Sequence, residues 1–256
     1  MVKFMQGGSA KMIEFNLKLC GKVISVTANY ESTRDFCKDY LVDEKNDFSV
    51  LVSMEDVYAE REKSDREREL EGLPKWEPPL PYLETLALYR KIAERLVSEN
   101  IILFHGSAIA LDGEVYLFTA KSGTGKSTHT RLWREVFGER AVMINDDKPL
   151  LAVRDDGVVV FGTPWNGKHR LGMNSSAPLK AICILERGEK NVIREESASS
   201  TFPEILSQTY RFSDVFGMTK TLGLLDKMLK LVKVYRLRCN MDKEAAEVSY
   251  NGMKGN

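Results

Sequence analysis

A glycine-rich segment that joins an apolar run to a helix-forming run constrains the fold of this chain more than any other feature. The apolar run is Val115–Phe118, the segment AKSGTGKST occupies 120–128, and helix-compatible residues continue to Phe137. Glycines allow successive backbone N–H groups to turn toward one bound anion, and the N-terminus of the following helix adds positive potential there. The order strand, loop, helix therefore predicts an α/β core that carries a phosphate-binding loop.

The residue types in this segment match the pattern GxxxxGK[ST] except at its first position, where Ala120 replaces glycine. Alanine fits that position if its φ is negative, and Gly123 and Gly125 still supply the tight part of the turn. Lys126 is expected to reach the β- and γ-phosphates of a nucleotide, and the Ser127 hydroxyl is expected to bind Mg²⁺. The residues expected to bind the nucleotide are Ser122, Gly123, Thr124, Gly125, Lys126, Ser127 and Thr128.

Two adjacent aspartates follow the next buried-strand pattern. Ala141–Ile144 runs directly into Asn145, Asp146 and Asp147, about twenty residues after the glycine-rich segment. The carboxyl ends of strands open onto the ligand crevice of an α/β sheet, so these acids are placed to share a site with the loop. We assign the metal to Asp146 and the proton of an attacking hydroxyl to Asp147, although the two roles can be exchanged. The alternative is that one of them caps the turn before Lys148.

Three further side chains are candidates for the same site. His105 follows the apolar run Ile101–Phe104 and is expected to lie beside the acids at a strand end. Lys168 and Arg170 follow Val158–Phe161 in a segment punctuated by glycine and proline, where they can bind phosphate or an acidic substrate. The alternative for that segment is a surface turn.

A proline-rich stretch divides the rest of the pattern into two domains, 1–80 and 81–256. The first is expected to be a small α+β unit that ends in a charged and proline-rich linker. The charge run at 55–70 is expected to be a solvated helix or a mobile connector, and the tail at 202–234 is expected to be helical. The expected elements are the strands Ile13–Leu19, Val23–Thr27, Phe48–Val52, Ile101–Phe104, Val115–Phe118, Ala141–Ile144, Val158–Phe161 and Ala181–Leu185, and the helices Ser32–Tyr40, Tyr82–Leu96 and Lys126–Phe137.

Charge balance limits the classes of partner. The 256 residues include 37 basic and 37 acidic side chains, so no net field holds the chain on nucleic acid or on an anionic membrane, and any anion site must be local. The four cysteines are far apart and form no CxxC pair, which argues against a zinc cluster and a disulfide framework. Because no apolar run reaches membrane-spanning length and the start lacks a leader pattern, we expect a cytoplasmic protein.

Taken in order, His105–Gly106, AKSGTGKST and Asn145–Asp147 are similar to the catalytic domain of the HPr kinase/phosphorylase family. The loop also resembles that of ATP-dependent phosphoenolpyruvate carboxykinase, whose fold that kinase shares. The resemblance covers 101–185, about a third of the chain. It implies that 81–256 form an α/β P-loop phosphotransferase core, with the small α+β unit before it, and that ATP and Mg²⁺ are cofactors. The kinase family forms oligomers, so a homo-oligomer is one option for this chain, and its oligomeric state is left open.

The chain departs from the family after the acid pair, where GTPWNGK at 162–168 replaces an acidic-Arg-Gly signature, so a phosphorylase activity is not implied. We expect an ATP- and Mg²⁺-dependent kinase that transfers the γ-phosphoryl group to a hydroxyl acceptor, either a serine of a peptide or protein or a small molecule. The alternative is a nucleotide-binding regulatory module with little or no turnover. The expected catalytic residues are Asp147, Asp146, Lys126 and His105.

Overall fold

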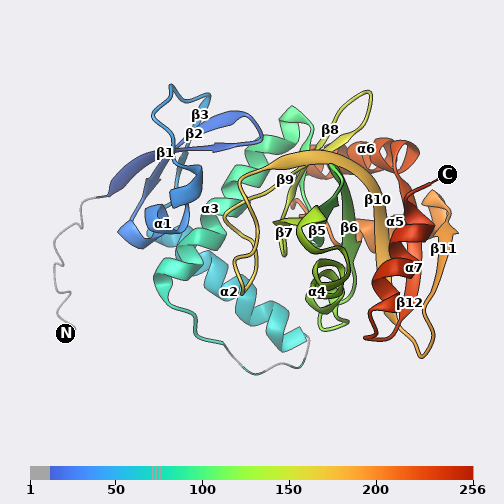
Figure 1. Ribbon diagram of the computed structural model, residues 1–256. Coiled ribbons are helices and arrows are strands. Elements are labelled where there is room, and N and C mark those ends of the chain that lie inside the picture. The colour runs from blue at the N-terminus through green and yellow to red at the C-terminus, as the bar shows by residue number, and fades with distance from the viewer. Residues whose placement is uncertain (1–11, 71, 73, 75, 256) are drawn as a thin grey trace. The chain divides into compact units, whose positions relative to one another are not determined.

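The computed structural model describes residues 12–70, 72, 74 and 76–255, and its chain divides into two compact units (Figure 1). The N-terminal unit ends at Ile92, and the C-terminal unit runs from Ala93 to Asn256. The sequence predicts a boundary at 80/81, about twelve residues earlier. The division falls later because helix α3 (Leu80–Leu96) begins in the first unit and ends in the second.

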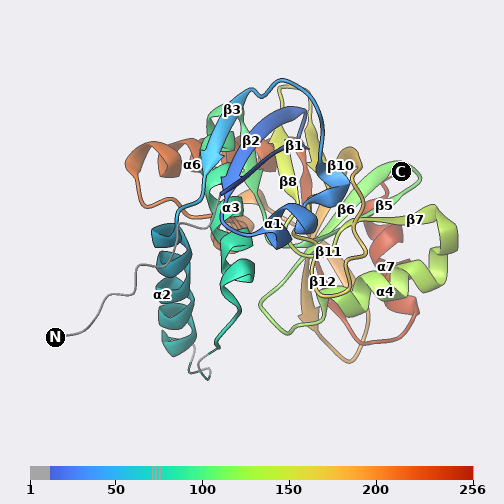
Figure 2. The ribbon, with the colours of Figure 1, turned by 90° about the vertical axis from the view of Figure 1, so that its left-hand side faces the viewer.

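The N-terminal unit combines a three-stranded sheet with helices. Before α3 its elements are β1 (Ile13–Leu19), β2 (Lys22–Ala28), α1 (Glu31–Phe36), the 3-10 helix η1 (Lys38–Tyr40), β3 (Phe48–Leu51) and α2 (Met54–Leu70). β1 and β2 form an antiparallel hairpin, and β3 lies parallel to β2 (Figure 2). The hairpin turn has positive φ at Cys20 (53°) and Gly21 (78°), as expected for a two-residue turn between twisted strands. The strands predicted in this unit are confirmed, and the predicted helix is broken between α1 and η1.

The charge run at 55–70 is the helix α2 and not a connector. Two of its carboxylates pair with cations of α3 inside the N-terminal unit: Asp56 lies 2.5 Å from Lys91, and Glu60 lies 2.6 Å from Arg90. Partly buried ion pairs of this kind hold a helix that has little apolar surface of its own.

Nine described strands of the C-terminal unit form one mixed sheet. They are β4 (Ile101–Leu103), β5 (Ser107–Leu111), β6 (Glu114–Thr119), β7 (Ala141–Asn145), β8 (Leu150–Val153), β9 (Val158–Phe161), β10 (Ser176–Arg187), β11 (Val192–Glu196) and β12 (Lys233–Cys239). The order is β4-β8-β9-β10-β6-β5-β7, with β12 also paired to β10 and β11 paired to β12. β10 pairs with antiparallel β9 at its start and with parallel β6 and β12 farther on, and Figure 1 shows it arching between them.

Helices cover both faces of this sheet. They are η2 (Val97–Glu99), α4 (Lys126–Phe137), η3 (Gly138–Arg140), α5 (Ala198–Ser207), α6 (Val215–Leu231) and α7 (Glu244–Met253). Apolar residues of α4 and α7 pack on one face around Trp133, and those of α5 and α6 pack on the other around Phe104. These two clusters are the core of the unit. The predicted helix 126–137 is α4, and the predicted strand 181–185 lies within β10.

The helical prediction for 202–234 is wrong in two places. The chain leaves helix between α5 and α6, where Asp214 starts α6 by accepting a hydrogen bond from the Gly217 N–H. β12 then begins at Lys233. The error arises because Val232 continues the helical spacing of Leu225 and Leu229 and is also buried where the strand begins. β5, β8, β11 and α7 are likewise not predicted by the sequence pattern.

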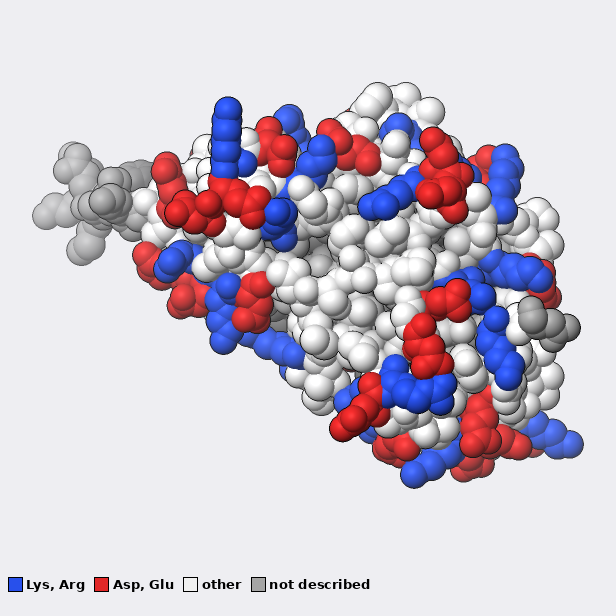
Figure 3. Space-filling view, turned by 45° about the horizontal axis from the view of Figure 1, so that its top comes forward, with Lys and Arg blue, Asp and Glu red and all other residues white. Residues whose placement is uncertain are grey.

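Basic and acidic side chains are interspersed on the face seen in Figure 3, in keeping with the balanced composition. None of the described helices combines the length and the apolar character needed to cross a membrane. The cysteines Cys20, Cys37, Cys183 and Cys239 are free thiols. Nowhere in the described residues do three or more His, Cys, Asp or Glu side chains form a group that could hold a metal ion.

Candidate active site

Strand direction brings the predicted site segments to one edge of the sheet. β10 is parallel to β6 and β12, and β5 is antiparallel to both β6 and β7, so β6, β7, β10 and β12 all end at the same edge. The glycine-rich loop follows β6, Asn145–Asp147 end and follow β7, and Arg187 ends β10. β5 runs the other way, so His105 and Ser107 lie at this edge through its start.

The glycine-rich loop takes positive φ at its glycines only. Gly123 has φ 75° and Gly125, the residue before α4, has φ 125°, whereas Ala120 is not in the left-handed region. The alanine at the first motif position is therefore unstrained, as the sequence predicts. Within the loop the Thr124 N–H donates to the Lys121 carbonyl over 3.2 Å, which closes a tight turn.

A buried polar contact with α7 anchors helix α4. The Trp133 Nε1–H donates to Ser249 Oγ (2.9 Å), and the His129 Nε2 lies 3.1 Å from the same oxygen. Burial lowers the pKa of His129 to about 3, so its imidazole is neutral at pH 7. The contact holds α4 against α7 and keeps the helix N-terminus at the edge where the loop lies.

Asn145 shapes the backbone that carries the two aspartates. Its Oδ1 accepts hydrogen bonds from the N–H groups of Asp147 (2.9 Å) and Lys148 (2.7 Å), and its Nδ2 donates to Thr163 Oγ1 (3.0 Å). A side-chain amide that bonds the backbone two and three residues ahead forces a turn directly after a strand. The turn sends Asp146 and Asp147 out of β7 in a fixed conformation.

The two aspartates have different surroundings. Asp146 is buried, with 7% of its surface exposed, and its Oδ1 has no hydrogen-bond partner among the described residues. Asp147 is more open: its Oδ1 lies 3.4 Å from His105 Nε2, and its Oδ2 lies 3.6 Å from Lys148 Nζ. A buried oxygen without a partner is suited to a cation, and an open carboxylate beside a histidine is suited to proton transfer.

Lys126 and His105 lie close enough to these acids to interact with them electrostatically. Burial lowers the pKa of the Lys126 ammonium, and the carboxylates of Asp147 and Asp146 oppose that shift. Burial also lowers the pKa of His105; Lys126 and Lys148 act in the same direction, and Asp147 acts against them. His105 is therefore neutral at pH 7. The Lys126 Nζ lies 3.4 Å from the Ala120 carbonyl, which leaves the ammonium within the loop.

The segment after β9 packs onto the acid turn through its glycines. A Cβ on Gly162 would lie 2.8 Å from the Ile144 carbonyl oxygen at the end of β7, and one on Gly167 would lie 3.6 Å from the Cβ of Asp147. Lys168 and Arg170 follow Gly167 and are exposed. The structure thus brings the backbone of this segment to the acid pair, while the roles expected for the Lys168 and Arg170 side chains stay predictions.

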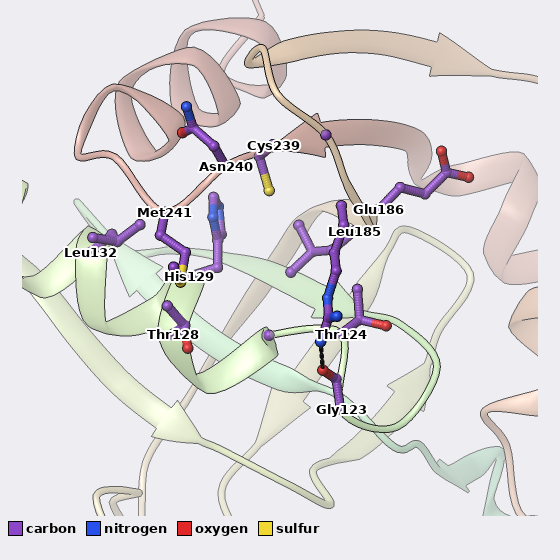
Figure 4. Close-up of a pocket in the computed structure, with 13 residues that line it drawn as sticks. Gly123, Thr124, Thr128, His129, Leu132, Leu185, Glu186, Cys239, Asn240 and Met241 are labelled. Carbon is purple, nitrogen blue, oxygen red and sulfur yellow. Dashed lines mark hydrogen bonds between the residues drawn. The ribbon is translucent and has the colours of Figure 1, made fainter.

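A cavity of about 570 Å³ adjoins the glycine-rich loop. Figure 4 shows side chains from α4, β10 and β12 around it, with Leu132, Leu185 and Met241 among its apolar walls. The loop contributes Gly123 and Gly125 to its rim. The volume is within the range of cavities that hold nucleotide-sized ligands.

One side chain at this site is missed by the sequence analysis. The Arg187 Nη2 donates to the Gly123 carbonyl over 2.7 Å, the bond drawn as a dashed line in Figure 4. Arg187 thereby fixes the orientation of the peptide in the tightest part of the loop. Its segment, ERGEKN at 186–191, has the composition of a solvated turn, so the sequence offers no signal for this contact.

The chain matches known proteins in structure but not in sequence. No protein-family model matches the chain, and no curated protein matches it in sequence. Among solved structures, the chain is similar to the Hpr(Ser) kinase/phosphatase from Coxiella burnetii, with 11% sequence identity over 60% of this chain and 99% of that one. The TM-score is 0.34, so the relation to that fold is distant, and the function must be argued from the side chains described above.

Proposed function

We propose that this protein is an ATP- and Mg²⁺-dependent kinase that transfers the γ-phosphoryl group to a hydroxyl acceptor. The observation that carries the proposal is the convergence of Lys126, Asp146 and Asp147 at one sheet edge, where the two carboxylates act on the pKa of the lysine. A cation and two acids beside a glycine-rich loop are the groups that phosphoryl transfer requires, because its catalysis depends on positioning and charge.

The residues present fit a magnesium ion. Asp146 offers a buried oxygen that lacks a partner in the described structure, and Ser127 at the start of α4 is exposed for a second contact. Mg²⁺ in nucleotide sites is held by one or two protein oxygens together with phosphate oxygens and water, so these two residues suffice. Bound there, the ion would supply charge neutralisation for the phosphates.

The remaining residues supply binding and proton transfer. Lys126 and the loop N–H groups bind the β- and γ-phosphates, and Asp147 accepts the proton of the acceptor hydroxyl. The acceptor oxygen forms a bond to the γ-phosphorus while the bond to the bridging oxygen breaks, which yields ADP and the phosphorylated acceptor. Neutral His105, 3.4 Å from Asp147, orients that carboxylate without neutralising it. The cavity of about 570 Å³ takes the nucleoside.

The test is a screen for ADP formation against hydroxyl acceptors, namely serine-containing peptides, free hydroxy amino acids and small alcohols. We expect the wild type to form ADP in excess of enzyme with at least one of them. Asp147→Asn should reduce the rate about 10²-fold or more and leave Mg-ATP binding intact, because it removes the base and not the phosphate contacts. Lys126→Ala should abolish both binding and turnover.

Two controls decide among the outcomes. Thermal unfolding with and without Mg-ATP measures binding separately from turnover, since a ligand that binds the folded state raises the melting temperature. Stabilisation by Mg-ATP without ADP formation would favour the nucleotide-binding regulatory module. The absence of both stabilisation and turnover would contradict the proposal, and an Asp147→Asn variant as active as wild type would remove Asp147 from the proton transfer.

A further inference from the structure

A groove of about 760 Å³ lies beside the candidate active site and has no part in the function proposed above. It shares Arg187 and Arg236 with a smaller cavity of about 310 Å³ that borders the glycine-rich loop at Lys121 and Thr124. The two hollows are therefore neighbours at the end of β10. Arg187, which holds the loop through Gly123, lines both.

Strand register explains why basic side chains line this groove. Arg194 of β11 lies opposite Arg236 of β12, and Val192 lies opposite Arg238. Directly opposed residues of antiparallel strands point to the same face, so the three arginines share one face of the sheet. A Cβ on Gly188 would lie 3.2 Å from the Cβ of Arg238, so the turn after β10 packs closely on that arginine.

The basic side chains of the groove are not equally compensated. Arg236 pairs with Glu186 (2.7 Å), Glu196 (2.9 Å) and Glu204 (2.6 Å), so it belongs to a closed structural cluster. By contrast, Lys190 and Arg238 are exposed and have no ion-pair partner among the described residues. Together with Arg187 they make one end of the groove positive, although the chain as a whole is neutral.

The smaller cavity leads from this positive end toward the proposed base. Thr119 and Gln208 line it, and both contact His105: the Thr119 hydroxyl donates to the His105 carbonyl (3.1 Å), and the His105 N–H donates to the Gln208 carbonyl (2.7 Å). His105 in turn lies 3.4 Å from Asp147. A chain that extends from the groove across the smaller cavity would therefore pass close to His105 and Asp147.

We propose that this groove binds an acidic segment of a polypeptide acceptor and so presents a nearby hydroxyl to Asp147. The inference rests on the proposed kinase function and names the class of its acceptor. An open groove with uncompensated cations at one end fits glutamate- or aspartate-rich chain by charge complementarity. Nucleic acid fits less well, because no aromatic side chain for base stacking is among the described lining residues of the groove.

The experiment measures binding of the full chain, without nucleotide, to fluorescein-labelled peptides by fluorescence anisotropy. In one peptide a serine is flanked by glutamates; in the matched peptide the glutamates are glutamines; a labelled oligothymidine is the nucleic-acid probe. We expect the glutamate peptide to bind about tenfold more tightly than the glutamine peptide, and its Kd to rise with salt. The double variant Lys190→Gln/Arg238→Gln should raise that Kd about fivefold or more.

The control is Lys230→Gln/Lys233→Gln, which removes two exposed positive charges from α6 and β12 outside the groove, each of them paired with a carboxylate, Asp226 and Glu195. It should leave the Kd within about twofold, and melting curves verify that each variant is folded. Equal binding of both peptides, an unchanged Kd in the groove variant, or tighter binding of oligothymidine would each overturn the inference. Because no nucleotide is used, charge-dependent binding without kinase activity would reject the kinase alone, and turnover without charge-dependent binding would reject the groove alone.

Discussion

Two buried carboxylates, Glu84 in the N-terminal unit and Asp146 in the C-terminal unit, differ in how their oxygens are satisfied. Glu84 is fully buried and accepts four hydrogen bonds of 2.5–3.2 Å, from the N–H and side-chain amide of Asn29, the Tyr30 N–H and the Thr33 hydroxyl. Asp146 is nearly as buried, yet its Oδ1 has no partner in the described residues.

The difference separates a structural acid from a ligand-ready one. Four donors compensate the buried charge of Glu84, so the N-terminal unit gains from holding it. An unpartnered buried oxygen costs folding free energy of about 1–3 kcal/mol, a cost that a bound cation at Asp146 would remove. Burial alone therefore does not distinguish the two roles, whereas the list of donors does.

The largest effect is expected from Asp146→Asn. If this oxygen binds the magnesium ion, the amide should reduce turnover about 10²- to 10³-fold and raise the Mg²⁺ concentration needed for half-maximal rate. Because Asp146 Oδ1 accepts no hydrogen bond in the described structure that the substitution could break, the free energy of unfolding should stay within about 1 kcal/mol of wild type. The assay is ADP formation across a magnesium titration, with urea unfolding alongside. Full turnover with an unchanged magnesium dependence would show that Asp146 does not bind the ion, and its difference from Glu84 would then have no functional meaning.

The isosteric change in the other acid, Glu84→Gln, should show the opposite behaviour. The new NH₂ group would face hydrogen-bond donors at a position where a carboxylate oxygen accepts their hydrogen bonds. The free energy of unfolding should therefore fall by about 2–3 kcal/mol. The magnesium dependence of turnover should be unchanged. Urea unfolding measures the loss, and Glu55→Gln, at an exposed position of α2, is the control. A loss no larger than that of the control would show that the four hydrogen bonds accepted by Glu84 do not require its negative charge.

The contrast also marks what sequence reasoning can reach. The strand, loop and helix around the glycine-rich segment, and the position of Asp146 and Asp147 after a strand, are confirmed because these signals are local in the sequence. Glu84 gives no such signal, since its donors are more than fifty residues away in the chain and only the fold brings them together.

Long-range contacts explain the other misses in the same way. The start of β12 at Lys233 is taken for helix because buried Val232, just before it, continues the spacing of Leu225 and Leu229, and only pairing with β10 makes the next residues a strand. Arg187 is overlooked because its charged neighbours resemble a solvated turn, and only the pairing of β10 with β6 places it against Gly123. The roles of the nucleotide-binding residues and of Lys168 and Arg170 stay predictions until a ligand is bound.

A third buried ionisable side chain, His129, sharpens the comparison because it remains neutral. Its pKa of about 3 in the folded chain is below the ordinary value of about 6.5, so the unfolded chain binds more protons between those limits. The contribution of His129 to the free energy of unfolding should therefore be at its maximum above about pH 6.5. Below that pH it should fall by about 1.4 kcal/mol per pH unit, down to about pH 3. His129→Gln should flatten this slope in urea unfolding, and His169→Gln, at an exposed site, should not. An unchanged slope in His129→Gln would assign the acid sensitivity to other groups.

The smallest effect concerns the backbone that packs beside Asp146. Gly167 has φ 78°, and a Cβ there would meet Asp147 Cβ at 3.6 Å, an ordinary contact, so the strain of Gly167→Ala comes from the backbone and not from a clash. The free energy of unfolding should fall by about 1 kcal/mol. Gly157→Ala, where a Cβ meets nothing within 4 Å and φ is not positive, should have less effect. If turnover in Gly167→Ala falls by much more than the stability change implies, the segment at 162–176 does more than cover the acid turn: it holds Asp146 in the conformation that leaves its oxygen unpartnered.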